Sequence, residues 1–460
     1  MKLTMRKHLY IIGVALTCSS CGIYTNYHQK EEVPTNLYGE EVPIDTSTVS
    51  LGDMSWRNLF TDPQLQALIE KGLQNNTDLQ SARLRVEQAE AAMLSAKLAF
   101  LPSFALAPQG TISSFDKHEA VETYQLPVAA SWQLDFFGGM RNAKKQAKAV
   151  LEQSRDYEQA VQTQLIAGIA NIYYTLQMLD AQLSISEETE RSWGESVKSI
   201  CALMYAGMAN EAAVSQMEAA HMSVKASVLD LKEQINQVEN SLSLLLAEPV
   251  HGISRTSWAE ASFACPEQLS IGLPIQLLAN RPDVRAAERS LEAAFYQTNV
   301  ARSAFYPSVT LSGSAGWTNS AGIGIVNPGK FLASAVGSLT QPLFAQGRLA
   351  GQLKIAKAQQ EQASLAFQQA LLNAGAEVNE AMMACETSRK KSDLLDKQVA
   401  SLEKAYQSTS LLMQHGNTTY LEVLTAQQSL LGAQLQQTVN RFKEVQSVIN
   451  LYQALGGGKE

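Results

Sequence analysis

Proline is scarce in this 460-residue chain, and its placement is uneven. The chain holds 13 prolines, but none lies between Pro127 and Pro249 and none follows Pro342. Both proline-free intervals are rich in Ala, Gln, Leu, Glu and Lys, which are good helix formers. Because proline breaks the interior of a helix, the two intervals predict long, uninterrupted helices.

Charge and cysteine are scarce as well. Charged residues make up 17% of the chain, apolar residues make up 45%, and the formal net charge is −8. A nucleic-acid-binding protein would carry a strongly basic surface, so that class is not expected. There is no Cys-x-x-Cys pair and no His-rich spacing, so neither a disulfide framework nor a metal site is predicted. Cys201, Cys265 and Cys385 are expected to be buried as small apolar side chains.

Catalytic motifs are missing too. The six histidines are scattered, and there is no His-Glu-x-x-His, Gly-x-Ser-x-Gly or phosphate-loop motif. The Gly322-Ile-Gly324 segment lacks the rest of a dinucleotide-binding turn, so we interpret it as an extracellular loop between strands. The sequence therefore predicts a protein that is not an enzyme and binds no cofactor.

Long apolar runs are also absent, since no stretch of the mature chain is long enough for a transmembrane helix. The first residues instead form a targeting signal. Lys2, Arg6 and Lys7 precede a short apolar run over 9–17, which is the layout of a signal peptide. We expect residues 1–20 to be removed.

Cys21 follows two serines and resembles the lipidated cysteine of a bacterial lipoprotein signal, although Cys18 stands where such signals usually have Leu. The prediction is a lipid-modified Cys21. The alternative is an ordinary secretory signal with a thiol that is free or oxidised. Residues 21–55 are polar and contain two prolines, so we expect a lipid-anchored tether.

The most informative feature that is present is an internal repeat. The segment Ala96–Phe104 recurs about 205 residues later as Ala301–Val309. Both segments begin with Ala and share the pattern Ala-Phe-x-Pro-Ser. Asn75, Asp78, Ala82, Glu87 and Ala89 recur at the same offset as Asn280, Asp283, Ala287, Glu292 and Ala294. The unit is too long for a solenoid. We predict two copies of one repeat, over 56–250 and 251–460.

Each proline-free interval contains one glycine-centred break, at 206–209 in the first copy and at 415–418 in the second. We expect a helical hairpin to turn at each break, over about 141–247 and 347–455. The first arm, 141–205, would be roughly 97 Å long at 1.5 Å per residue. Helices of this length belong to coiled coils or helical tubes rather than to globular cores.

A shorter helix precedes each hairpin and has a heptad pattern. The spacing of 3 and 4 residues places alanine at every second position of the seam, which allows close helix packing. An ordinary amphipathic helix on a globular core would explain one seam but not two. The seam positions are Leu79, Ala82, Val86, Ala89, Met93 and Ala96, and then Val284, Ala287, Leu291, Ala294, Thr298 and Ala301.

Two strands are expected between the short and the long helix of each copy, over about 102–136 and 307–343. In Tyr124–Phe136 apolar and aromatic residues alternate with mostly polar or small ones, and Val309–Trp317 alternates in the same way. This pattern and length are typical of transmembrane β-strands; a half-buried soluble sheet is the alternative. Their partners are predicted at Phe104–Phe115 and Phe331–Leu339, which gives four strands in the chain.

Four strands cannot close a barrel, and lipid cannot satisfy the open edges of a sheet. The chain therefore needs further copies of itself, and three copies would supply twelve strands.

Four segments resemble the outer membrane efflux protein family, the TolC-like ducts, and especially its lipoprotein branch. Asn280–Arg289 is similar to the most specific family signature. The closing motif departs from the family in one respect, because the Trp that often follows it is Lys459 here. The other segments resemble the family's start, its first strand-to-helix junction and its closing motif: Trp56–Leu65, Ser131–Gly138 and Leu451–Gly458.

The resemblance implies a mainly α fold with a small membrane β part: a trimeric α-barrel of long helical hairpins and a 12-stranded transmembrane β-barrel. It implies an outer-membrane exit duct, anchored by lipid and extending into the periplasm. The expected function is passive conduction of small toxic compounds from an inner-membrane pump and a periplasmic adaptor. The exit duct of a type I protein secretion system is an alternative. A non-pore coiled-coil scaffold or adhesin is an alternative of another class.

The resemblance also suggests functional residues. The two glycine turns would form the periplasmic tips that contact the adaptor, through Ala206, Gly207, Met208, His415, Gly416 and Asn417. The family's gate often uses acidic residues six and nine positions after the second glycine, and these positions hold Glu422 and Thr425 here. Glu422 is therefore the gate candidate, and a solvated glutamate on a helix face is the alternative. We expect Arg281, Asp283 and Arg285 to be structural, because proline and an acidic residue suit a helix N-terminus.

Overall fold

The two copies of the repeat form helices of matching length. The computed structural model describes Tyr24, 26–28, Leu37, 51–114, 116, 119–258, 280–318 and 329–458. Cys21, the signal segment, Cys265, Phe115 and the Gly322–Gly324 segment lie outside the described residues. The paired helices have 22, 67 and 35 residues: α4 Thr77–Leu98 with α8 Pro282–Ser303, α5 Gly139–Tyr205 with α9 Arg348–Gln414, and α6 Glu211–Leu245 with α10 Tyr420–Ala454.

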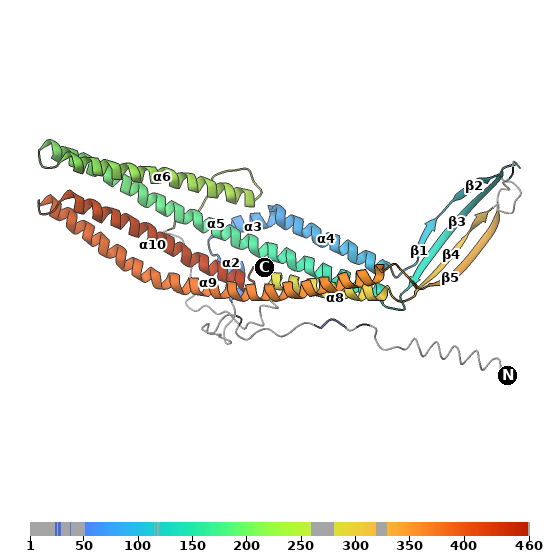
Figure 1. Ribbon diagram of the computed structural model, residues 1–460. Coiled ribbons are helices and arrows are strands. Elements are labelled where there is room, and N and C mark those ends of the chain that lie inside the picture. Colours follow the sequence, from blue (N-terminus) through green and yellow to red (C-terminus); the bar gives the residue numbers. More distant parts are fainter. Residues whose placement is uncertain are drawn as a thin grey trace. The chain divides into compact units, whose positions relative to one another are not determined.

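The predicted hairpins are confirmed (Figure 1). The first arm begins at Gly139, two residues before the predicted start, and ends at Tyr205 as predicted. Three short helical elements precede α4: η1 Leu51–Asp53, α2 Trp56–Leu59 and α3 Pro63–Asn75. No helix in the described part of the chain is both long and apolar enough to cross a membrane.

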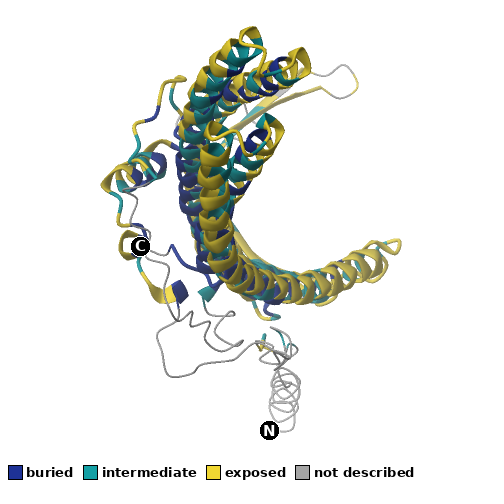
Figure 2. Cartoon of the chain, turned by 90° about the vertical axis from the view of Figure 1, so that its left-hand side faces the viewer, coloured by how far each residue is buried: buried dark blue, intermediate teal, exposed yellow. Residues whose placement is uncertain are grey.

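The chain divides into two compact units, each assembled from three stretches of sequence. Unit 1 comprises 1–31, 85–154 and 286–368, and unit 2 comprises 32–84, 155–285 and 369–460. Buried residues run as stripes along the helices, whose other faces are exposed (Figure 2). The predicted heptad seams follow these stripes: Leu79 and Ala82 are at most 1% exposed, and Val284 and Thr298 are equally buried.

In unit 2, one hydrophobic cluster joins the ends of α5, α6 and α10 near the turns. It includes Trp193 and Ile200 of α5, Val214 and Met217 of α6, and Leu424 of α10. Full burial of one such side chain contributes about 1.5–3 kcal/mol relative to exposure. Both helical turns therefore rest on one shared core.

Unit 2 also contains the same long-range contact in both copies. Asn76 Nδ2 donates to the carbonyl of Leu245, the last residue of α6, at 2.9 Å. Arg281 Nη1 donates to the carbonyl of Ala454, the last residue of α10, at 3.1 Å. The last carbonyls of a helix have no partner within the helix, so each copy closes its second long helix with a side chain from the start of its own short helix.

Unit 1 contains an antiparallel sheet (Figure 1). β3 Val121–Leu134 pairs with β4 Ser308–Thr318, and β4 pairs with β5 Lys330–Thr340. On the other side of β3 lie β1 Ser103–Leu106 and β2 Gln109–Ser113. The predicted partners of β3 and β4 are confirmed, whereas the pairing of β3 with β4 was not predicted; β1–β2 and β5 are the two edges among the described residues.

The predicted alternation gives the sheet two chemically different faces. Leu126, Trp317 and Phe331 are aligned across three strands, with the two rings 5.9 Å apart. Three residue pairs further along the sheet, on its other face, Ser314 and Ser334 hydrogen-bond through their hydroxyls at 2.8 Å. The apolar face is exposed, as in Leu126 and Phe331 at 47% and 64%, which is the arrangement of a strand with lipid on one side.

Two strand predictions need correction. The expected strand over 104–115 is interrupted at Ala107 and Pro108, because proline has no N–H to donate to β3. The strand expected to reach Phe136 ends at Leu134. The Asp135 carboxylate that follows accepts hydrogen bonds from the N–H groups of Met140 and Arg141 at 3.0 and 2.8 Å, and so caps the start of α5.

Candidate functional site

The first helical turn is built around Gly207, whose φ is +75°. The N–H of Gly207 donates to the carbonyl of Met204 at 2.9 Å, and the N–H of Met208 donates to that of Leu203 at 2.8 Å. This pair of bonds is a Schellman motif, which needs a left-handed residue and therefore favours glycine. Asn210 then caps α6, because its side chain accepts from the N–H of Ala213 at 2.9 Å.

The second turn repeats this geometry at Gly416, whose φ is +72°. The N–H of Gly416 donates to the carbonyl of Met413 at 3.0 Å, and the N–H of Asn417 donates to that of Leu412 at 2.9 Å. The start of α10 differs from the start of α6, because the side chain of Thr419 makes no capping hydrogen bond. The sequence thus predicted both turns, but only the structure identifies the difference between the helix starts.

Both turns are open to approach by another molecule. A Cβ atom built on either glycine would meet no heavy atom within 4 Å. Met208 is 76% exposed, and Tyr205 before it is 86% exposed. Large apolar side chains at such a tip have no packing role in the chain itself, whereas they could pack against a partner.

Glu422 lies in the first turn of α10 and is exposed. Its carboxylate accepts a hydrogen bond from the hydroxyl of Thr418, and a negative charge there favours the helix N-terminus. The hydroxyl of Thr425 donates to the backbone carbonyl of Leu421 at 2.8 Å. Glu422 therefore has a local contact that an isolated glutamate on a helix face would lack, and it keeps its carboxylate at the turn.

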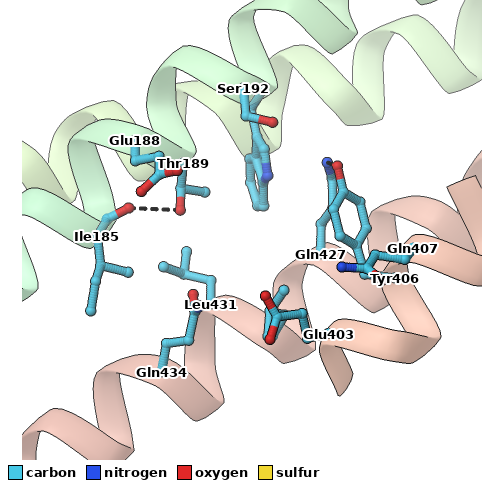
Figure 3. A pocket seen from close by; sticks show the side chains of 12 residues that line it. Ile185, Glu188, Thr189, Ser192, Glu403, Tyr406, Gln407, Gln427, Leu431 and Gln434 are labelled. Carbon is cyan, nitrogen blue, oxygen red and sulfur yellow. Dashed lines mark hydrogen bonds between the residues drawn. The ribbon is translucent and has the colours of Figure 1, made fainter. Parts of the chain in front are cut away.

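A cavity of about 250 Å³ lies in unit 2 between α5 and the pair α9 and α10 (Figure 3). Trp193 of α5 and Tyr406 of α9 supply aromatic rings, while Glu188 and Glu403 supply carboxylates at its exposed rim. No Lys or Arg lines this cavity. The space is consequently polar and acidic.

Gln427 lines the same cavity and is buried. Its Nε2 donates to the hydroxyl of Tyr406 at 3.2 Å, and its Oε1 accepts no hydrogen bond from any described residue. Sequence reasoning missed Gln427 because glutamine is common along these helices and nothing in its spacing distinguishes it.

The Asn280–Arg289 segment has a structural role, as predicted. Arg281 is buried and forms ion pairs with Asp283 at 2.6 Å and Glu377 at 2.7 Å. Burial lowers the pKa of the Arg281 guanidinium, but the hydrogen bonds to Asp283 and Glu377 and their negative charges together more than compensate, so its pKa is raised and the group stays charged. Arg285 pairs with Asp156 of α5 at 2.9 Å. These contacts hold helices together.

Two other segments that resemble the family also have structural roles in unit 2. Trp56 is fully buried, and the Asp62 carboxylate that follows accepts a hydrogen bond from the Tyr173 hydroxyl at 2.6 Å. The Tyr452 hydroxyl donates to the carbonyl of Met54 at 2.8 Å and accepts from the N–H of Gly458 at 2.7 Å. The segment just before α2 is thereby joined to the end of α10.

Within the part of the chain that the structure describes, no group of His, Cys, Asp or Glu could hold a metal ion. Cys385 is buried as predicted, whereas Cys201 is only half-buried at the edge of the hydrophobic cluster under the first turn. Neither of these two thiols forms a disulfide with a described residue.

Comparison with known proteins agrees with this architecture. The family model described as "Outer membrane efflux protein" matches residues 68–248 and 273–457. The cation efflux system protein CusC of Escherichia coli O6:H1 is 29% identical over 450 residues, covering 97% of each chain. The pyoverdine export outer membrane protein OpmQ of Pseudomonas putida is 28% identical over 468 residues, covering 99% of this chain and 98% of OpmQ.

Solved structures show the same fold. The open state of the Neisseria gonorrhoeae MtrE outer membrane channel has a TM-score of 0.86 at 27% identity, over 96% of this chain and 99% of MtrE. Channels of this family are trimers that work with efflux pumps and adaptors. The protein is accordingly an outer-membrane channel that extends into the periplasm, and it is not an enzyme. With both of its copies matched by the family model, the chain belongs to the outer membrane efflux protein family.

Proposed function

We propose that a homotrimer of this chain, fed by an inner-membrane pump through a periplasmic adaptor, passes small toxic compounds across the outer membrane. The observation that supports this most directly is the pair of exposed glycine turns, both with a left-handed glycine, at the ends of the long hairpins. A scaffold without a pore would not need a strand sheet with one apolar and one hydroxyl-lined face. We also propose that 56–250 and 251–460 serve as the two repeats of the duct.

The cargo is not singled out by the relatives. Proteins of nearly equal identity to this chain are named for cation efflux, pyoverdine export and toluene efflux. A duct passes what its pump delivers, so cargo has to be determined with the cognate pump present.

The test is a strain that lacks this chain, supplied with the wild-type gene or an empty vector. Accumulation of several dyes is measured together with susceptibility to copper, silver, solvents and antibiotics. Raised accumulation or susceptibility that the wild-type gene reverses supports efflux and identifies the cargo class. Unchanged accumulation together with loss of a secreted protein from the medium would favour the type I secretion duct instead.

For the adaptor contact, we propose the tip residues Ala206, Gly207 and Met208 with His415, Gly416 and Asn417. Met208→Glu places a charge at the exposed first tip, and Met222→Glu is the matched control on α6, where Met222 is 56% exposed. We expect Met208→Glu to abolish complementation and the control to retain it. Both variants must form trimers on a native gel. Full complementation by Met208→Glu would contradict the contact.

For the gate, we propose that three Glu422 side chains, one from each chain of the trimer, form a negative ring at the periplasmic entrance. Such a ring repels anions and favours cations. Glu422→Gln should lower the cation preference of the channel, measured as the reversal potential across a KCl gradient in a planar bilayer. Glu211→Gln, in the first turn of α6, is the matched control. Equal reversal potentials for Glu422→Gln and wild type would exclude the ring.

For the anchor, we propose that Cys21 carries the lipid. The mature protein should show an acylated N-terminal cysteine by mass spectrometry, and Cys21→Ser should lose that mass. An unmodified cysteine in the wild-type protein would mean that the β-sheet alone retains the chain in the membrane.

A further inference from the structure

The start of α5 carries a basic face. Arg141, Lys144, Lys145 and Lys148 are spaced by three and four residues, so they lie on one side of the helix. All four side chains are exposed. We call these four residues the α5 basic face.

The neighbouring helix segments of unit 1 share this bias. Lys97 and Arg302 lie near the ends of α4 and α8, and Arg348, Lys354 and Lys357 lie near the start of α9. No Asp or Glu occurs in the helix segments that adjoin the strands, which are 91–98, 139–151, 293–303 and 348–360. A chain with a formal net charge of −8 thus has only positive charge on the helix turns next to its sheet.

Aromatic residues mark the end of the sheet at the same place. Trp132 Nε1 donates to the carbonyl of Phe100 at 2.8 Å, and the rings of Phe137 and Tyr306 stack with centroids 5.2 Å apart. Aromatic residues gather where membrane strands meet the headgroup layer. The α5 basic face begins at Arg141, within about two helical turns of this aromatic level.

The N-terminal tether gives a second, independent marker of the membrane surface. A Cβ on Gly138 would lie 3.1 Å from the ring of Tyr24, and Lys145 Nζ donates to Asn26 Oδ1 at 3.3 Å. Two residues separate Cys21 from Tyr24, so the three residue steps between them span at most about 11 Å. Acyl chains on Cys21 would therefore enter the membrane close to the α5 basic face.

A cavity of about 340 Å³ lies at this face. It is lined by Met93 and Phe100 together with Arg141, Lys144, Lys145 and Lys148. Lys144 Nζ lies 5.9 Å from the centroid of the Phe100 ring. Asp135 pairs with Arg141 at 3.3 Å, whereas neither Lys144 nor Lys148 forms an ion pair with any described residue. The cavity thus offers an apolar floor beside ammonium groups that lack a carboxylate.

We propose that the α5 basic face binds the phosphate of an anionic phospholipid in the periplasmic leaflet of the outer membrane. Lys144 and Lys148 contact the phosphate, and Met93 and Phe100 contact the first carbons of the acyl chains. Basic clusters next to membrane segments bind anionic lipid headgroups in this way. The site would fix the height of the strands in the membrane, and it requires only that the chain is in the outer membrane, whatever cargo it conducts.

The experiment counts lipids bound to the full-length trimer by native mass spectrometry. Delipidated trimer is titrated with phosphatidylglycerol, phosphatidylcholine or glycerol 3-phosphate at equal concentrations. We expect phosphatidylglycerol to bind more strongly than the other two. Lys144→Gln with Lys148→Gln should weaken phosphatidylglycerol binding by about fivefold for each lysine removed, and it should leave phosphatidylcholine binding unchanged.

The matched control is Lys397→Gln with Lys404→Gln, two exposed lysines of α9 in unit 2. This control should bind phosphatidylglycerol as the wild type does. An equal loss of phosphatidylglycerol binding in both double variants would overturn the proposal. Equal binding of phosphatidylglycerol and phosphatidylcholine by the wild type would overturn it as well. Equal binding of glycerol 3-phosphate would also overturn it and indicate a site for free phosphate.

Assembly can be read from the same spectra. If the double glutamine variant forms no trimer, the test moves to Lys144→Arg with Lys148→Arg and to the wild type in high salt. The arginine variant should keep the lipid, and the wild type should lose it as salt screens the charges. Retention of the lipid by the wild type in high salt would then count against the proposal.

Discussion

The two copies of the repeat have the same helix lengths but different side-chain chemistry at equivalent positions. Asn76 in the first copy and Arg281 in the second each donate to the last carbonyl of the long helix that closes their own copy. Asn76 is neutral, whereas Arg281 also pairs with Asp283 and Glu377. Both copies thus keep a hydrogen bond to the last carbonyl of the helix, but the side chain that donates it differs between them.

The helix ends diverged in the same manner. Gly456 closes α10 with a φ of +80°, and its counterpart Ala247 closes α6 with a φ of +54°. At the turns, Asn210 caps α6, while α10 starts at Thr419 without a side-chain cap. The first copy therefore tolerates a strained alanine where the second has glycine, and the second tolerates a weaker helix start where the first has asparagine.

The largest difference in stability between the copies should come from removing the side chain that donates to the last helix carbonyl. Arg281→Ala leaves two carboxylates without their guanidinium, and because both are partly solvated we expect a loss of about 3 kcal/mol in unfolding free energy. Asn76→Ala removes one buried amide and should cost about 1.5 kcal/mol. The measurement is urea-induced unfolding of the trimer followed by circular dichroism.

Arg281→Lys serves as the control for charge alone, and its loss should lie between those of the two alanine variants because lysine lacks the guanidinium fork. If Arg281→Ala and Asn76→Ala lower stability equally, the ion pairs of the second copy add nothing to the carbonyl contact.

Exchanging the helix-closing residues should give effects of opposite sign. Gly456→Ala adds a Cβ 2.5 Å from the carbonyl oxygen of Asn280 in a left-handed conformation, so we expect destabilisation by about 2 kcal/mol. Ala247→Gly relieves the strain in the first copy and should stabilise by about 0.5–1 kcal/mol. Thermal dissociation of the trimer, compared side by side for the two variants, measures both. Destabilisation by Ala247→Gly would show that Ala247 is not strained.

The smallest expected effect is the change in stability of Asp283→Asn at acidic pH. Burial raises the pKa of Asp283, but the hydrogen bond from Arg281, its positive charge and two backbone hydrogen bonds together lower it more, so the pKa lies below the ordinary 3.8. A carboxylate with a lowered pKa stabilises the fold above its ordinary pKa, and this stabilisation is lost as the pH falls through the lowered value. Asp283→Asn should thus be less stable than wild type at pH 7, by about 1 kcal/mol. The difference between the two should shrink below pH 4. Urea unfolding at pH 7, 4 and 3 tests this, and a gap that stays constant would refute it.

Much of the fold could be predicted because its signals are local. The proline-free intervals and the glycines at 207 and 416 identified the hairpins, since a long helix excludes proline and a Schellman turn needs a left-handed residue. Period-two alternation identified the strands and their two faces. The interruption of the first strand could also have been inferred, because Pro108 stands inside the predicted strand.

The rest depends on contacts between residues far apart in sequence. Arg281 meets Ala454 across 173 residues, and no pattern in one sequence reports that pairing. The cavity at Gln427 arises where three helices diverge, which depends on how they pack rather than on their periodicity. The basic residues next to the strands were visible in the sequence, but a role at the membrane surface could be inferred only once the structure showed which helix ends adjoin the sheet.

The equal lengths of the paired helices restrict how this protein can change. Inserting one residue into α5 or α9 would rotate everything beyond it by about 100° and shift it by about 1.5 Å, which would turn one tip relative to the other. Arms of 67 residues in both copies therefore leave little room for insertions and deletions. Natural variation between relatives should be concentrated in substitutions, and an engineered duct of a different length should be built by adding whole heptads to both arms and both return helices together.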